Sequence, residues 1–145
     1  MHELSRYLFI AGACPFLFLG VAHAVATPRR TDERKGLSPS DPSLAEQMTR
    51  ATVRLTRRTD LWKAWVGFNL SHSLGAVVFG ALVVLVARSE ASFAAEGPLF
   101  APLALLVSSV YLVLAVRYWF KTPILGCALS VALFLASCVL RLLGR

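Results

Sequence analysis

Residues 62–87 read WKAWVGFNLSHSLGAVVFGALVVLVA, and this stretch indicates the class of fold to which the chain belongs. Between Lys63 and Arg88 it carries no Asp, Glu, Lys or Arg, and it exceeds the ~20 residues with which a helix crosses ~30 Å of hydrocarbon. Backbone polar groups find no water inside a bilayer, so such a segment must satisfy them internally. The stretch therefore predicts a transmembrane helix.

Three further apolar runs give the rest of the chain the same character. The four predicted transmembrane helices are 7–27, 62–87, 99–118 and 123–143. The chain is 57% hydrophobic, whereas a soluble domain carries about 45–50% apolar residues. Its single sizeable polar stretch, 28–60, leaves no room for a separate soluble domain. We expect an all-α, polytopic membrane protein that forms one domain, 1–145, as a bundle of four transmembrane helices.

The positive charges predict how these helices are oriented. Of the 15 Lys and Arg residues, eleven lie in 28–63 or in the turn 117–121. The remaining four are Arg6, Arg88, Arg141 and Arg145. Lys and Arg are in excess in cytoplasmic loops, so loop 28–60 is predicted to be cytoplasmic and both termini periplasmic or external.

The tripeptide Ala22-His23-Ala24 leaves one alternative open. It follows an apolar stretch and has the form of a signal-peptidase site, and cleavage there would remove the first span. Cleavage would also place the basic residues of 28–60 outside, against the charge bias. We therefore expect four spans, with the cleavage left open.

The polar segment 28–60 contains a predicted amphipathic helix that leads into the second span. Asp41 followed by Pro42 has the form of an N-cap and a first helical residue. The apolar residues at helical spacing are Leu44, Met48, Ala51 and Leu55, and the basic residues on the other side are Arg50, Arg54 and Arg57. The basic side predicts contact with anionic inner-leaflet lipids and not with nucleic acid, while a solvated extension of the second span is the alternative.

Polar residues inside the second span form two stripes. Trp62, Trp65, Asn69 and His72 share one face of a helix, and Gly67, Ser71 and Gly75 share another. Small residues four apart let helices approach closely, so the second stripe predicts helix packing, within the bundle or in a homo-oligomer. Asn and His cost free energy in lipid unless they face protein or water, which makes the first stripe the candidate binding site.

Polar residues of the other spans extend this site into a layer. His23 is four residues from the end of the first span and His72 about eight residues into the second, so at ~1.5 Å per residue both lie in the cytoplasmic half. The predicted ligand-binding residues are His23, Trp65, Asn69, His72, Tyr118 and Ser130.

Three functions stay open for this layer. It can supply interhelical hydrogen bonds in a non-enzymatic membrane protein, which is the interpretation we favour. It can bind a lipid, sterol or quinone, or act as a membrane enzyme through His72 and His23. It can hold a haem with both histidines as axial ligands.

Other chemistry is disfavoured by the residues that the spans lack. No metal site is predicted, because two histidines and an amide lack a third strong ligand. All eight Asp and Glu residues lie outside the apolar runs, which excludes carboxylate-based chemistry within the membrane.

The string WKAWVGFNLSHSLG at 62–75, together with Gly20-x-x-His23, Asp41-Pro42 and Tyr118-Trp119-Phe120, resembles an uncharacterised family of short bacterial four-helix integral membrane proteins. The resemblance covers most of the chain. It implies four spans, and with them we expect the inner membrane of a bacterial cell. It also marks Trp62, Trp65, Asn69, Ser71 and His72 as the signature of the family, and it implies no activity.

Overall fold

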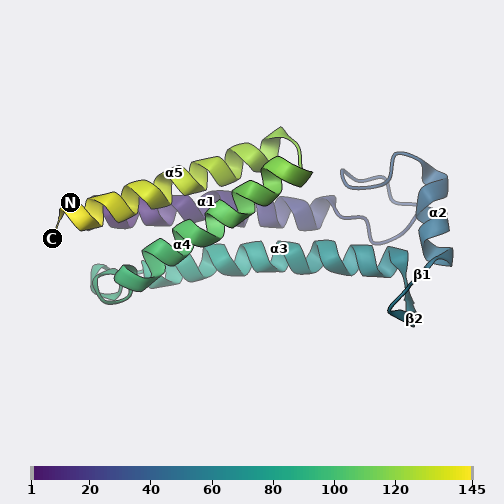
Figure 1. Cartoon of the computed structure of the whole chain (residues 1–145), viewed down its shortest axis with the longest axis horizontal. Helices are drawn as coiled ribbons and strands as arrows, with labels where there is room; N and C mark the ends of the chain where they lie inside the picture. Colours follow the sequence, from purple (N-terminus) through teal and green to yellow (C-terminus); the bar gives the residue numbers. More distant parts are fainter. Residues whose placement is uncertain (1, 145) are drawn as a thin grey trace. The chain divides into compact units, whose positions relative to one another are not determined.

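The computed structural model describes residues 2–144 and the side chains of 3–144. In chain order, the elements are α1 (His2–Ala26), α2 (Pro42–Arg50), β1 (Thr52–Val53), β2 (Thr56–Asp60), α3 (Leu61–Val86), α4 (Glu90–Tyr118) and α5 (Lys121–Leu143) (Figure 1). Within the described chain, α1, α3, α4 and α5 are long and apolar enough to cross a membrane. The predicted all-α class with four membrane-length helices is therefore confirmed.

The helix α4 begins earlier than the sequence predicted. It starts at Glu90, whereas the predicted span starts at residue 99. Ser89 is its N-cap, and the Ser89 side chain accepts a hydrogen bond from the backbone N–H of Ser92 at 3.1 Å. Alanines in the first turns favour a helix, and membrane helices tolerate internal prolines such as Pro98. Pro98 therefore lies inside the helix and does not mark its start.

The chain divides into two compact units. One unit, which we call the terminal unit, consists of Met1–Leu19 with Ala76–Arg145, and the other, the loop unit, consists of Gly20–Gly75. The boundary cuts both α1 and α3, so each unit contains part of these two helices. The predicted site residues of α1 and α3 all fall in the loop unit.

Aromatic side chains form the core of the terminal unit, in which α4 and α5 pack against each other. The rings of Phe9 and Phe93 have centroids 5.2 Å apart, and those of Phe9 and Phe134 are 5.5 Å apart. Such pairs contribute ~0.5–1.5 kcal/mol each beyond the area they bury. A Cβ atom at Gly12 would lie 2.6 Å from the ring of Phe134, so the close approach of α1 and α5 requires a glycine there.

Two serines join the first turns of α1 to the last turns of α5. The hydroxyl of Ser5 donates to the carbonyl of Ser137 at 2.8 Å, and the hydroxyl of Ser137 donates to the carbonyl of Ser5 at the same distance. Both side chains are fully buried. Because each serine binds the backbone of the other, neither leaves a buried donor without an acceptor.

Two arginines bind the backbone on either side of the turn between α3 and α4. The Nη1 atom of Arg6 donates to the carbonyl of Ala87 at 3.2 Å, and that of Arg141 donates to the carbonyl of Phe93 at 3.0 Å. The Arg141 guanidinium also lies 4.7 Å from the centroid of the Phe93 ring. A Cβ atom at Gly97 would lie 2.5 Å from this guanidinium, so the glycine makes room for it.

The start of α2 in the loop unit agrees with the predicted helix. Asp41 is the N-cap, and its Oδ1 atom accepts from the backbone N–H of Ser43 at 2.8 Å. Pro42 occupies the first turn, where its missing N–H costs no hydrogen bond. Ala45 is buried and Met48 is half-buried, whereas Leu44 is exposed.

The predicted continuation of this helix to Leu55 is wrong. The helix ends at Arg50, and residues 52–60 form an antiparallel β-hairpin, so Arg50, Arg54 and Arg57 do not share the face of one helix. Four of these residues, Thr52, Val53, Thr56 and Thr59, are β-branched and favour a strand. The backbone N–H of Leu61 donates to the carbonyl of Ala51 at 2.8 Å and closes the base of the hairpin.

Candidate functional site

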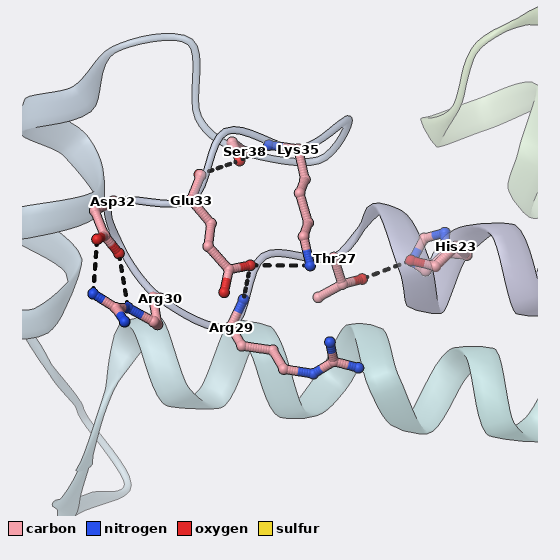
Figure 2. Close-up of polar contacts among 8 residues, drawn as sticks. All are labelled: His23, Thr27, Arg29, Arg30, Asp32, Glu33, Lys35 and Ser38. Atoms are coloured by element: carbon pink, nitrogen blue, oxygen red, sulfur yellow. Dashed lines mark hydrogen bonds and ion pairs between the residues drawn. The ribbon is translucent and has the colours of Figure 1, made fainter.

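His23 lies in the last turn of α1. Residues that follow this turn donate hydrogen bonds to its backbone carbonyl groups. The Thr27 hydroxyl donates to the carbonyl of His23 at 2.8 Å (Figure 2). The backbone N–H of Leu37 donates to the carbonyl of Ala26 at 3.1 Å. Thr27 and Pro28 are fully buried, so the chain leaves the helix along a defined path.

Opposite charges in the loop after α1 are paired within the loop. The Glu33 carboxylate accepts from the backbone N–H of Arg29 at 3.2 Å and pairs with the Lys35 ammonium at 3.0 Å (Figure 2). Lys35 first, and then the Arg29 N–H, hold the pKa of Glu33 below its usual value. Arg30 holds the pKa of Asp32 down in the same way. These carboxylates are therefore charged at neutral pH and stabilise the loop beside His23.

The central contact of the site joins His23 of α1 to Asn69 of α3. The Nε2 atom of His23 lies 2.9 Å from Oδ1 of Asn69. The Nδ2 atom of Asn69 donates to the carbonyl of Trp65 at 2.8 Å, which identifies Oδ1 as the acceptor in the first contact. His23 must then carry its proton on Nε2, a tautomer assigned from this network.

His72 lies beside this hydrogen bond. Its ring centroid is 5.2 Å from that of His23, and the two planes meet at 63°. The ring of Phe68 is nearly parallel to that of His72, at 15°, with centroids 6.4 Å apart. His72 is half-buried, whereas Phe68 is 68% exposed on α3. The two imidazoles thus form one cluster with an exposed aromatic side chain at its edge.

The structure brings together only part of the predicted layer. His23, Trp65, Asn69 and His72 meet in the loop unit, where Trp65 supplies its backbone carbonyl. The two other predicted residues belong to the terminal unit. There Tyr118 is 71% exposed at the end of α4, and Ser130 is fully buried in α5 with no partner for its Oγ atom among the described residues.

Two residues of the cluster, Thr27 and Ser73, were not among the predicted site residues. Thr27 binds the carbonyl of His23, and the hydroxyl of Ser73 donates to the carbonyl of Asn69 at 2.9 Å. Each stands four residues after the residue that it binds, a spacing at which Ser and Thr hydroxyls reach back to the preceding turn of a helix. That spacing was the signal available in the sequence.

The predicted packing stripe lies on the surface of α3. Gly67, Ser71 and Gly75 are all exposed, and a Cβ atom at Gly67 would meet nothing within 4 Å. Close helix contacts occur instead at other glycines, such as Gly80, where a Cβ atom would lie 2.8 Å from Leu17. The stripe is not used within the described chain, and the homo-oligomer stays a prediction.

In this structure the two imidazoles are not placed as the axial ligands of one haem. Iron–imidazole bonds of ~2 Å on both faces of a macrocycle would set the ring centroids ~6 Å apart. The observed centroids are 5.2 Å apart, and His23 uses Nε2 toward Asn69. Within residues 2–144, no group of three His, Cys, Asp or Glu residues is placed to hold a metal ion.

Comparison with known proteins adds no assignment to this geometry. No protein-family model, curated protein sequence or solved structure matches the chain. The resemblance to a bacterial four-helix family therefore stays an expectation, and the contacts around Asn69 carry the functional inference.

Proposed function

We propose that this chain is a non-enzymatic, multi-pass membrane protein in which His23 and Asn69 clamp the first two membrane-spanning helices together. The observation that carries the proposal is that both polar atoms of the buried Asn69 side chain are hydrogen-bonded within the protein. Its Oδ1 atom accepts from His23, its Nδ2 atom donates to Trp65, and it is 5% exposed. Because Asn69 is buried and both of its polar atoms already bind partners within the protein, a structural role fits it better than binding of a substrate.

The environment of the clamp gives it a structural role. Interhelical hydrogen bonds in membranes contribute ~0.6–2 kcal/mol each. Removing one partner costs more, because a buried donor or acceptor without a partner loses ~1–3 kcal/mol. The clamp therefore favours one rotational setting of α1 against α3 over settings in which the imidazole and the amide face lipid.

The proposal includes the arrangement in the membrane. We infer four spans in one bundle in a bacterial inner membrane, with loop 28–60 cytoplasmic and the termini periplasmic. The excess of Lys and Arg in the loop supports this orientation. The bonds from Ser5 to Ser137 and from Arg6 to Ala87 support it too, because they join the start of α1 to the end of α5 and to the α3–α4 turn. Those three parts then share one side, as an even number of spans requires.

A double-mutant cycle tests the clamp. His23→Ala, Asn69→Ala and the double variant are compared with the wild type by unfolding in mixed detergent micelles. We expect each single change to cost ~1–3 kcal/mol and the double change to cost less than their sum. Ser71→Ala is the matched control, because Ser71 is exposed on α3 and its hydroxyl binds the carbonyl of Phe68 in its own helix. Additive losses at His23 and Asn69 would refute the clamp.

A second candidate function is the binding of a lipid, sterol or quinone at His72. The half-buried imidazole beside the exposed Phe68 ring favours it, since an apolar ligand could rest on Phe68 with a polar group toward His72. Mass spectrometry of the protein purified in mild detergent tests this candidate. If His72 binds such a ligand, a small molecule should co-purify with the wild type and with Ser71→Ala but not with His72→Ala. Equal recovery in both variants would reject this second function.

A further inference from the structure

The hairpin of residues 52–60 is a surface element. It contains no residue of the His–Asn clamp or of the four membrane-length helices. Val53 pairs with Thr56, so Arg54 and Leu55 form its tip. Leu55 is 93% exposed, more than any other large hydrophobic side chain that the structure describes. Most of the others lie on the four membrane-length helices, where lipid can cover them. Among the exposed large hydrophobic residues outside these helices, Leu55 is the most exposed that the structure describes.

Basic residues without acidic partners surround this apolar tip. Arg54, Arg57 and Arg58 are exposed and form no ion pair with any residue in the described part of the chain. The nearest basic residues outside the hairpin are paired, Arg50 with Glu46 and Lys63 with Asp60. Lys63 holds the pKa of Asp60, the one carboxylate of the hairpin, below its usual value. The hairpin therefore presents three uncompensated positive charges, which an anionic surface would neutralise.

The position of the hairpin in the chain, directly before α3, indicates that the anionic surface is that of a lipid bilayer. Asp60 directly precedes α3, and the bond from Leu61 to Ala51 ties the base of the hairpin to the start of this helix. Trp62 and Lys63 follow at once, as is typical of a membrane–water boundary. Figure 1 shows the hairpin at the N-terminal end of α3 and turned across the axis of that helix. If α3 crosses a bilayer, the hairpin runs along the bilayer surface.

We propose that the hairpin is an interfacial anchor for anionic phospholipid. Leu55 enters the boundary between headgroups and acyl chains, and Arg54, Arg57 and Arg58 bind headgroup phosphates through charge-assisted hydrogen bonds. The five residues of β2 span ~17 Å at ~3.3 Å per residue, so the tip reaches lipids beyond those that touch α3. The anchor is independent of the His–Asn clamp, since no residue of one belongs to the other.

Hydrogen exchange in lipid nanodiscs tests the anchor with the full chain. The wild type is placed in discs of phosphatidylcholine alone or of phosphatidylcholine mixed with phosphatidylglycerol. We expect amide exchange in residues 52–60 to be slower in the mixed discs, with exchange in α3 the same in both. Each arginine at an anionic surface contributes about fivefold to binding, so replacing all three by Gln should weaken the contact ~100-fold and abolish the slowing. Leu55→Asp should abolish it as well.

A matched control separates the hairpin from net charge. Replacing Arg29, Arg30 and Arg34 by Gln removes the same number of charges from the loop after α1 and should leave the slowing at 52–60 intact. Equal exchange of the wild type in both discs would overturn the anchor. So would slowing that survives the change of Arg54, Arg57 and Arg58. Protection that grows with protein density in phosphatidylcholine alone would also overturn it, in favour of contact with a second copy.

Discussion

The terminal unit and the loop unit both bury polar side chains, but these side chains have different partners. In the terminal unit, Ser5 and Arg141 donate to backbone carbonyls of another helix. In the loop unit, His23 donates to the side chain of Asn69. A helical carbonyl can accept a second bond whatever residue carries it, whereas an amide side chain must stand at the right position. The loop-unit contact therefore depends on the identity of both residues, whereas each terminal-unit contact depends on the identity of the donor alone.

The largest effect is expected from removing the contacts of Arg141 in the terminal unit. Arg141→Ala removes both the hydrogen bond to the Phe93 carbonyl and the contact with the Phe93 ring, and should destabilise the protein by ~2–4 kcal/mol. Unfolding by SDS in mixed micelles measures the loss. Arg88→Ala, at an exposed residue of the α3–α4 turn, is the control and should stay within ~0.5 kcal/mol of the wild type. Equal losses in the two variants would show that net charge, and not the Phe93 contacts, stabilises this end.

A somewhat smaller effect tests the identity requirement in the loop unit. Asn69→Leu keeps the branched shape and the number of side-chain heavy atoms but leaves the Nε2 proton of His23 without its acceptor, and we expect a cost of ~1–3 kcal/mol in the same assay. Ser73→Ala removes only a hydroxyl that binds the preceding turn of its own helix, and should cost well below ~1 kcal/mol. A neutral Asn69→Leu variant would mean that the imidazole finds another acceptor.

A third change tests how tolerant the serine pair is. Ser137→Ala removes one of two reciprocal bonds, while the Ser5 hydroxyl can still donate to the carbonyl of residue 137. We expect the free energy of unfolding of this variant, measured in the same assay, to be ~1 kcal/mol lower than that of the wild type. The double change to alanine should cost less than ~2 kcal/mol, because it removes both buried hydroxyls together. A loss far above ~1 kcal/mol in the single variant Ser137→Ala would show that the serines depend on each other's identity, like His23 and Asn69.

The smallest effect concerns the paired charges beside the clamp. The pKa of Glu33 is lowered, so its pairing stabilises the loop above its ordinary pKa of 4.5 and is lost as the pH falls through the lowered value. Glu33→Gln should therefore unfold at a lower temperature than the wild type at about pH 7, with the difference vanishing as the pH falls below the lowered pKa of Glu33. A pH-independent difference would show that Glu33 acts by packing and not by charge.

Part of the candidate site was predictable from helical spacing alone. Trp65, Asn69 and His72 lie on one face of a helix because they recur at intervals of three and four residues. The contact between His23 and Asn69 was predictable only as a shared depth, since the two residues are 46 positions apart. Tyr118 shows the limit of arguments from depth. It lies near the end of its span as predicted, yet its side chain is mostly exposed, because depth says nothing about which way a side chain points.

The four membrane-length helices follow from the sequence, because the free energy of placing a segment in hydrocarbon is a sum over its own residues. The N-cap at Asp41 follows as well, since a cap depends on neighbouring residues. Tertiary structure decided what depends on distant partners. Residues 51–55 continue the apolar spacing of a helix, but pairing with 56–60 and the bond from Leu61 to Ala51 make them part of a hairpin. Which polar side chains meet was likewise decided by packing, because a buried donor is stable only where another helix brings an acceptor within ~3 Å.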